Sequence, residues 1–181
     1  MRLFIAIKLS DPMKEAIIHT QNSIYDHGIR GNYTREENLH LTLAFIGEYP
    51  DPRPVMDALE KVSFAPFELE LKGMGSFGDL WWAGIKDTAS LTAVVGRLRR
   101  ALDDTGIPFD RKRFSPHITL IRKADGRMPE IEIPKASMTV SALSLMRSDR
   151  GKPEAPFGRN RMIYTEIGTR EAESERPVAR A

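Results

Sequence analysis

Two histidine–threonine pairs in this sequence have the residue types and the spacing for acid–base chemistry. His40 and Thr42 lie in the sequence NLHLTLAF, and His117 and Thr119 lie in the sequence SPHITLIR. The imidazole of histidine titrates near neutral pH, with an ordinary pKa of about 6.5. Two imidazoles, one neutral and one protonated, can hydrolyse a phosphodiester without a cofactor, because one deprotonates water and the other protonates the departing oxygen.

Both pairs lie in strand-like runs, in which side chains alternate between two faces. His40 and Thr42 therefore share one face, and their apolar neighbours share the other. The same holds for His117 and Thr119. A single strand histidine is most often a hydrogen-bonded core residue, and threonine is simply a good strand former. The recurrence favours a site instead, in which the histidines exchange protons and the threonine hydroxyls donate to phosphate oxygens.

Arg122 comes five residues after His117, so simple alternation puts it on the opposite face of the strand. It can reach the histidine face only if the strand bends or ends there. A guanidinium suits a phosphate because it offers fixed, paired donors. Phosphate binding and an exposed arginine at a strand end both remain open from the pattern.

The aromatic residues considered for the site are Phe4, Phe45, Trp81 and Trp82, all in predicted strands. Core packing is the first expectation for all four. Base stacking is the alternative, and Phe4 and Phe45 are the candidates for it. One member of the Trp-Trp pair must face away from the core or line a groove. Arg2 is expected on the surface.

Hydrophobic periodicity and helix caps predict the remaining elements. Strands are predicted at residues 2–7, 38–47, 67–71, 80–85, 115–122, 137–146 and 162–167, and helices at residues 11–27, 54–61 and 88–104. Residues 147–161 are polar and contain glycine and proline, so a loop is predicted. The glycines at 73, 75 and 78 match the spacing of a dinucleotide-binding loop, but a strand follows them, so they predict a turn.

The two halves of the chain repeat one order: a helix, a His-x-Thr strand and two further strands. Trp82 follows His40 by 42 residues (82 − 40), and Tyr164 follows His117 by 47 (164 − 117). This order predicts an α+β fold of two similar lobes, each an antiparallel sheet backed by helices, with the site in the groove between them. Residues 1–168 form this bilobal domain, and residues 169–181, charged and without apolar periodicity, are expected to be a disordered tail.

Composition narrows the class of protein. The chain has 181 residues, no cysteine and a net charge of +2. The lack of cysteine fits a cytoplasmic location, and we find no signal peptide and no stretch that could span a membrane. Neither His-x-Thr motif carries a carboxylate, so no metal and no other cofactor is expected. The weak positive charge does not by itself indicate nucleic-acid binding.

With both motifs and the first strand RLFIAI, the sequence resembles the two-histidine (2H) phosphoesterase superfamily, and within it the LigT-like RNA 2′,3′-cyclic phosphodiesterases, also called 2′-5′ RNA ligase-like proteins. The resemblance implies metal-independent opening of 2′,3′-cyclic phosphates at RNA ends to 2′-phosphates, in some members with reversible 2′-5′ ligation. It implies that His40 is the general acid, that His117 is the general base, and that Thr42, Thr119 and Arg122 bind the phosphate.

Two other functions remain open. The same chemistry could act on a small cyclic nucleotide phosphate, or the groove could bind RNA ends without catalysis. In all three cases the expected partner is a cyclic-phosphate RNA end or a small cyclic nucleotide, and no obligate protein partner is expected.

Overall fold

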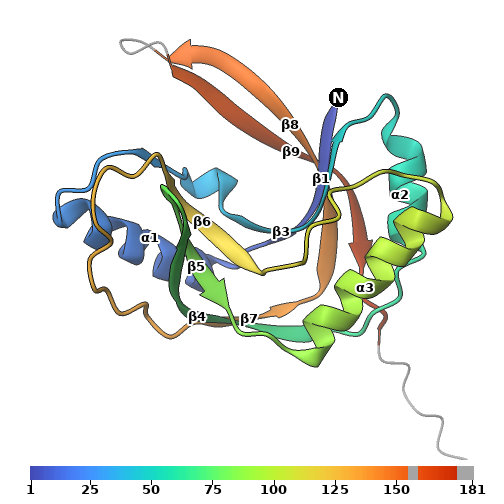
Figure 1. The fold of residues 1–181 in the computed structure, drawn as a ribbon. Helices are drawn as coiled ribbons and strands as arrows, with labels where there is room; N and C mark the ends of the chain where they lie inside the picture. The colour runs from blue at the N-terminus through green and yellow to red at the C-terminus, as the bar shows by residue number, and fades with distance from the viewer. Residues whose placement is uncertain (155–158, 175–181) are drawn as a thin grey trace, which may run out of the picture.

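The computed structural model describes residues 1–154 and 159–174. Two antiparallel sheets lie opposite each other, with helices on their outer sides (Figure 1). The first sheet contains, in spatial order, β3 (His40–Glu48), β1 (Arg2–Lys8), β8 (Ala142–Glu154) and β9 (Arg159–Glu171). The second contains β2 (Asn32–Tyr33), β6 (His117–Arg122), β5 (Leu80–Ile85), β4 (Phe67–Phe77) and β7 (Ser137–Val140). The predicted fold class is confirmed.

The three helices begin at residues suited to capping. They are α1 (Asp11–Asp26), α2 (Pro52–Glu60) and α3 (Ala89–Asp104). The side chains of Ser10, Asp51 and Thr88 each accept a hydrogen bond from the first turn of the helix that follows. A short 3₁₀ helix, η1 (Glu36–Asn38), leads directly into β3. Within the described ranges, every helix is too short or too polar to cross a membrane.

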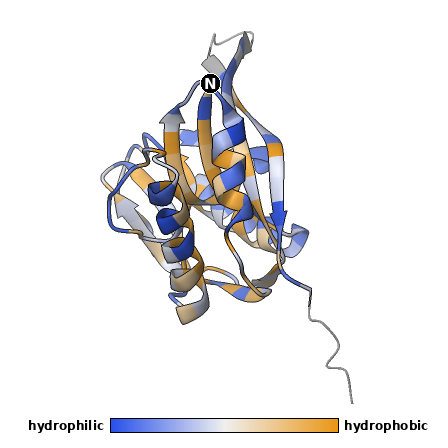
Figure 2. Cartoon of the chain, turned by 90° about the vertical axis from the view of Figure 1, so that its right-hand side faces the viewer, coloured by the Kyte–Doolittle hydropathy of each residue, from blue (hydrophilic) through white to orange (hydrophobic). Residues whose placement is uncertain are grey.

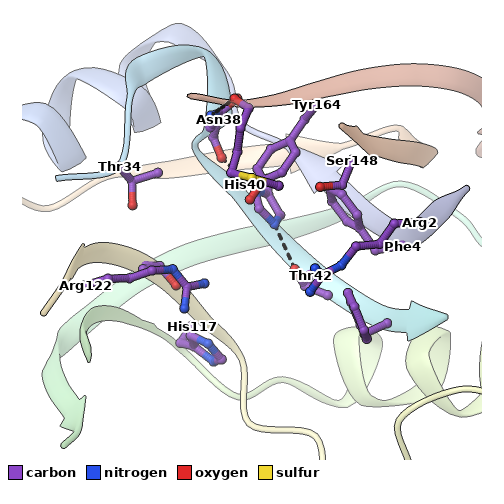
Figure 3. A pocket seen from close by; sticks show the side chains of 13 residues that line it. Arg2, Phe4, Thr34, Asn38, His40, Thr42, His117, Arg122, Ser148 and Tyr164 are labelled. Atoms are coloured by element: carbon purple, nitrogen blue, oxygen red, sulfur yellow. Dashed lines mark hydrogen bonds between the residues drawn. The ribbon is translucent and has the colours of Figure 1, made fainter. Parts of the chain in front are cut away.

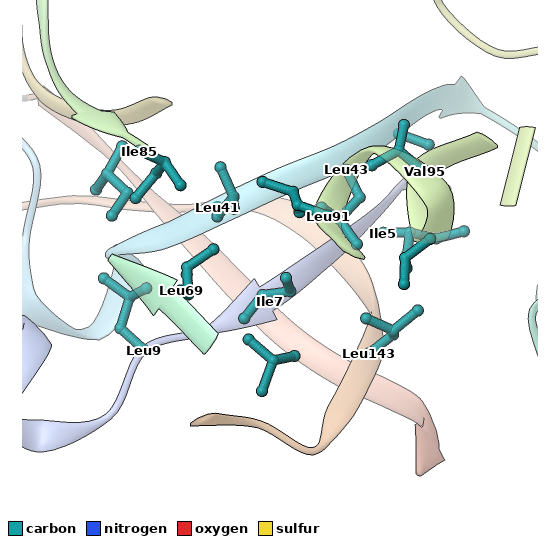
Figure 4. Packing of buried hydrophobic residues seen from close by; sticks show 14 of the residues in the cluster. Ile5, Ile7, Leu9, Leu41, Leu43, Leu69, Ile85, Leu91, Val95 and Leu143 are labelled. Atoms are coloured by element: carbon teal, nitrogen blue, oxygen red, sulfur yellow. The ribbon is translucent and has the colours of Figure 1, made fainter. Parts of the chain in front are cut away.

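α1 packs on the second sheet, α2 packs on the first, and α3 contacts both. α1 connects β1 of the first sheet to β2 of the second, and it packs on β6 and β7 of the second. α3 connects β5 to β6 of the second sheet, and it packs on β3 of the first sheet and β4 of the second. Buried aliphatic side chains fill the layers between helices and sheets, among them Leu41, Leu91 and Leu143 (Figure 4). Figure 2 shows apolar residues concentrated on the strands inside the molecule.

The strands also cross between the halves of the sequence. β4 and β5 follow the first histidine motif, but they pair with β6 and β7 in the second sheet. β8 and β9 follow the second motif, but β8 pairs with β1 in the first sheet and β9 pairs with β8 at its edge. The strand predicted at 137–146 is in fact two strands in different sheets, and the chain passes from one sheet to the other at Ser141.

The predicted loop at 147–161 is wrong. β8 runs to Glu154 and β9 starts at Arg159, so the two strands form a long hairpin that extends beyond the body of the protein (Figure 1). Apolar periodicity misses this extension because backbone pairing, not a buried face, holds it together. β4 likewise continues past the predicted turn to Phe77, and only Gly78 and Asp79 turn the chain.

The prediction of a disordered tail is wrong for its first residues. β9 ends at Glu171, and the backbone amides of Ala172 and Glu173 donate to the carbonyls of Ser141 and Phe64. Residues 175–181, the rest of the predicted tail, lie outside the described residues.

Candidate active site

A cavity of about 360 Å³ lies between the sheets and brings both histidine motifs together (Figure 3). All seven residues predicted for the site line it: Phe4, His40, Thr42, Phe45, His117, Thr119 and Arg122. Six further residues complete the lining: Arg2, Thr34, Asn38, Ser148, Met162 and Tyr164. In Figure 3, His40 and Thr42 lie on one wall, while His117 and Arg122 lie on the other.

Both imidazole rings are oriented in the same way. Nδ1 of His40 lies 2.7 Å from the carbonyl oxygen of Asn38, and Nδ1 of His117 lies 2.7 Å from the carbonyl oxygen of Ser115. In each case the acceptor is two residues before the histidine. A carbonyl oxygen only accepts, so Nδ1 carries the proton and donates it. Nε2 is therefore the reactive nitrogen of both rings.

The two threonines occupy equivalent positions, and Thr42 has a defined contact. Its hydroxyl oxygen lies 2.8 Å from Nε2 of His40 (Figure 3). In neutral His40 this nitrogen is an acceptor, so the Thr42 hydroxyl donates to it. A substrate oxygen that takes a proton from Nε2 must displace this hydroxyl, which then becomes available to a phosphate oxygen.

The environment of His40 favours its neutral form. Burial lowers the pKa of His40 below its ordinary value of 6.5, the carbonyl of Asn38 acts in the opposite direction, and the positive charges of Arg122 and His117 lower the pKa further. That the charge of His117 acts on His40 agrees with their placement in one cavity. Excess positive charge in this cavity suits an anionic ligand.

A β-bulge reorients the first motif strand. Register along β1 shifts between Ile5 and Ala6, because Ile5 pairs with Ala44 whereas Ala6 pairs with Thr42. Leu43 is the extra residue, and Leu43 and Ala44 are consecutive buried positions. Such a bulge inverts the alternation of the residues that follow it. Phe45 therefore faces the cavity, although simple alternation puts it on the core side.

The second motif strand contains the same bulge at the same distance from its histidine. Trp81 pairs with Ile121 and Trp82 with Thr119, so Leu120 is the extra residue. Leu120 and Ile121 are again consecutive buried positions. The bulge turns Arg122 into the cavity, which resolves the question that alternation left open. Phe45 and Arg122 are equivalent, each five residues after its histidine.

The equivalent positions 45 and 122 differ in chemistry, because only the second carries a guanidinium group. On the side of the first motif, Arg2 brings a guanidinium group to the cavity. Phe45 occupies the position that Arg122 has in the second motif. The guanidinium carbon of Arg2 lies 5.1 Å from the centroid of the Phe45 ring, and Arg2 lines the cavity. The expectation that Arg2 lies on the surface is confirmed, because Arg2 is exposed. It also lines the cavity, since Arg2 and Phe4 are two residues apart on one strand and therefore share a face.

Each histidine contacts aromatic residues that lie far away in the sequence. His40 has Tyr164 edge-on at 5.3 Å and Phe4 at 5.0 Å between ring centroids. Tyr164 follows the second motif, so it reaches His40 because β9 crosses into the first sheet. Phe4 packs with Ala6 and Met146 in a small apolar cluster on the cavity side of that sheet.

His117 has a similar pair on its own sheet. Phe77 is edge-on at 5.1 Å and Trp82 lies at 6.1 Å. Both follow the first motif in the sequence. Trp82 pairs with Thr119 across the ladder, so it is on the cavity-facing side of the sheet, while Trp81 is buried in the core. The expectation that the two tryptophans face opposite sides is confirmed.

Sequence reasoning missed several residues around the histidines: Thr34, Asn38, Phe77, Ser148, Met162 and Tyr164. Asn38 is buried, and its side-chain amide donates to the carbonyl of Met162 at 2.9 Å, which ties the start of β3 to β9. Ser148 pairs with Arg2 across the ladder. Contacts between β9 and η1 have no signature in the sequence, because nothing local pairs residues more than a hundred positions apart.

Among residues 1–154 and 159–174, we find no group of three or more His, Cys, Asp or Glu side chains that could hold a metal ion. Besides the two imidazoles, the polar side chains that line the cavity carry hydroxyl, guanidinium and amide groups. This donor set suits an anion better than a cation.

Comparisons with known proteins point to one family. An RNA 2′,3′-cyclic phosphodiesterase of Geobacillus stearothermophilus is 34% identical over 135 residues, which are 70% of this chain and 43% of that protein. The chain therefore matches less than half the length of this relative. The enzyme of the same name from Archaeoglobus fulgidus is 30% identical, over 72% of this chain and 77% of its own length.

Solved structures agree with the sequence relatives. LigT of Escherichia coli in complex with 3′-AMP superposes with a TM-score of 0.76 at 27% identity, covering 96% of this chain and 98% of LigT. The model of the 2′-5′ RNA ligase superfamily matches residues 11–152, that is, 142 of 181 residues. The chain belongs to the 2′-5′ RNA ligase superfamily.

Proposed function

We propose that this protein hydrolyses 2′,3′-cyclic phosphates at RNA ends to 2′-phosphates, without a metal ion, in the cavity between its sheets. The observation that carries the proposal is the pair of histidines in one cavity, each with Nδ1 fixed by a backbone carbonyl and Nε2 left for chemistry. Relatives from several organisms have the name RNA 2′,3′-cyclic phosphodiesterase, and LigT structures contain 3′-AMP or phosphate.

The reaction follows from the roles assigned to the two imidazoles. Neutral His117 takes a proton from water at Nε2, and the resulting hydroxide attacks phosphorus. Protonated His40 gives its Nε2 proton to the 3′ oxygen as the bond between phosphorus and that oxygen breaks. Arg122 and the hydroxyls of Thr42 and Thr119 stabilise the charge on the non-bridging oxygens. The product keeps the phosphate on the 2′ oxygen.

A cyclic-phosphate oligoribonucleotide incubated with the protein in EDTA tests this proposal. We expect turnover to a 2′-phosphate, and a loss of about 100-fold or more in kcat for His40→Ala and for His117→Ala. His19→Ala is the matched control, since His19 is an exposed histidine on α1 that is remote from the cavity lining. A 3′-phosphate product, or turnover that survives both substitutions, would contradict the mechanism.

The size of the natural substrate is part of the same proposal. A cavity of about 360 Å³ is near the lower end for ligand sites and suits one nucleotide, with the rest of an RNA outside it. We expect kcat/KM to be higher for an oligomer than for 2′,3′-cyclic AMP, because remote contacts contribute to transition-state binding. Equal values would favour a small cyclic nucleotide as substrate, and tight binding without product would favour an RNA-end binding protein. RNA as substrate agrees with a cytoplasmic location, which we include in the proposal.

A further inference from the structure

The aromatic pairs beside the two histidines differ in exposure. Phe4, beside His40, is 4% exposed and lines the cavity. Phe77, beside His117, is 50% exposed although its ring edge meets an imidazole. Single exposed apolar residues are common on protein surfaces. An exposed aromatic ring next to a reactive group is a stronger indication of a binding site, because its free face can contact a ligand there.

Phe77 is held on a rigid support. Its ring lies 5.4 Å from that of Trp82, and both belong to the β4–β5 hairpin in the middle of the second sheet. Trp82 itself lies directly over Gly75, where a Cβ atom would come within 2.3 Å of the indole. Glycine at position 75 therefore makes room for the indole. Together Phe77 and Trp82 form an aromatic platform beside His117.

The direction of the proposed reaction determines what can reach this platform. In a displacement at phosphorus the attacking and leaving oxygens are roughly in line, on opposite sides of the phosphorus. The leaving 3′ oxygen faces His40, so the attacking oxygen enters beside His117. Whatever carries the attacking oxygen extends away from phosphorus on the side of Phe77. A water molecule makes no use of an aromatic surface there, whereas a nucleoside does.

We propose that Phe77 and Trp82 form a second nucleoside subsite, which stacks the base of a nucleotide whose 5′-hydroxyl replaces water as the nucleophile. This inference rests on the proposed function and adds a binding site to it. The bond between phosphorus and the 5′ oxygen forms while the bond to the 3′ oxygen breaks. His117 takes the proton of the 5′-hydroxyl and His40 gives one to the 3′ oxygen, so a 2′-5′ linkage and a free 3′-hydroxyl result. The reverse reaction uses the same contacts.

The test compares two substrates on the same protein. Hydrolysis of 2′,3′-cyclic AMP needs no second nucleoside, whereas cleavage of 2′-5′-linked diadenosine to 2′,3′-cyclic AMP and adenosine does. Phe77→Leu keeps an apolar side chain against His117 but removes the stacking face. We expect it to lower kcat/KM for the dinucleotide about 10-fold more than kcat/KM for the cyclic nucleotide. Phe77→Trp should restore the ratio.

Tyr25→Leu provides the matched control, because Tyr25 is an exposed aromatic residue on α1 and should leave the ratio unchanged. Equal losses on both substrates would mean that Phe77 only supports His117, and would overturn the subsite. A wild-type protein that hydrolyses the cyclic nucleotide but neither cleaves nor forms the 2′-5′ linkage would also overturn it. Failure of the wild type on both substrates would instead overturn the proposed function, and the subsite with it.

Discussion

His40 must carry a proton to act as the acid of the proposed reaction, and its surroundings oppose that proton. Burial is the largest cause of its lowered pKa, and the charges of Arg122 and His117 add to it. A bound phosphodiester carries one negative charge and would act in the opposite direction. The acid is therefore expected to become protonated together with substrate binding, so that the free protein keeps His40 neutral and hydrogen-bonded to Thr42.

The pH dependence of a variant without His117 separates the two roles. In His117→Ala, the residual kcat/KM should fall with rising pH, starting below pH 6.5, because only protonated His40 donates and burial still lowers its pKa. In the same variant kcat should also fall with rising pH, but at a higher pH than kcat/KM, since the bound anion raises the pKa of His40. Initial rates from pH 4.5 to 8.5 measure both limbs.

Far-UV circular dichroism over the same pH range checks that the His117→Ala variant stays folded. A residual kcat/KM that rises with pH would mean that His40 is the base, and the assignment of acid and base would then have to be exchanged. The two macroscopic pKa values of the wild type cannot replace this experiment, because they belong to the coupled pair.

At the scale of single elements, the same β-bulge shapes both strands that carry the histidine motifs. A bulge three residues after each histidine inverts the strand and turns the fifth residue inward, Phe45 in β3 and Arg122 in β6. The bulge in β6 has an additional support. The Gln21 side chain, buried on α1, donates to the carbonyls of Thr34 and Leu120 at 2.8 and 3.0 Å.

Gln21→Met tests the link between α1 and the bulge of β6. Methionine has a similar volume but no donor, so the carbonyl of Thr34 loses the partner it has in Gln21. The free energy of unfolding should fall by about 1–3 kcal/mol. Because Arg122 follows the bulge by two residues, KM for a cyclic nucleotide should rise as well.

Urea denaturation and steady-state kinetics measure these two effects. Ser23→Ala is the control, since its hydroxyl donates to the carbonyl of His19 within α1 at an exposed position, and its loss should cost less than about 0.5 kcal/mol. Unchanged stability and unchanged KM in Gln21→Met would show that the backbone ladder alone fixes the bulge.

The sequence predicted elements wherever burial is periodic. The helices and the motif strands were located correctly because one side of each is apolar. The β8–β9 hairpin was missed where it leaves the core, and the single strand predicted at 137–146 was divided, because alternation does not reveal which sheet a strand joins. The bulges were not predicted either, since Leu43 and Leu120 continue the apolar alternation that precedes them.

At the scale of the whole molecule, the crossed strands connect the two lobes. Each sheet takes strands from both halves of the sequence; α1 of the first half packs on β6 and β7 of the second half, and α3 of the second half packs on β3 and β4 of the first. The first half by itself holds one strand pair of each sheet, β1–β3 and β4–β5, and the two-residue strand β2, whose partner β6 lies in the second half. Pairs of strands are marginal in water. The lobes of the structure are therefore not the repeats of the sequence.

The crossing predicts that neither half folds alone. Fragment 1–86, which ends in the segment between β5 and α3, should show no cooperative thermal transition by circular dichroism. Mixed with fragment 87–181, it should recover a cooperative transition and hydrolysis of 2′,3′-cyclic AMP. The intact chain is the reference. A cooperative transition of fragment 1–86 by itself would contradict the prediction.

The sequence by itself determined the chemistry: two imidazoles and two hydroxyls at a spacing that alternation places on one face of each strand. That inference holds because the period of a strand is local. Tertiary structure decided which residues surround these groups. Tyr164 reaches His40 and Phe77 reaches His117 through crossed strands, and Arg122 turns inward through a bulge. These placements depend on pairing between distant segments, which side-chain periodicity does not encode.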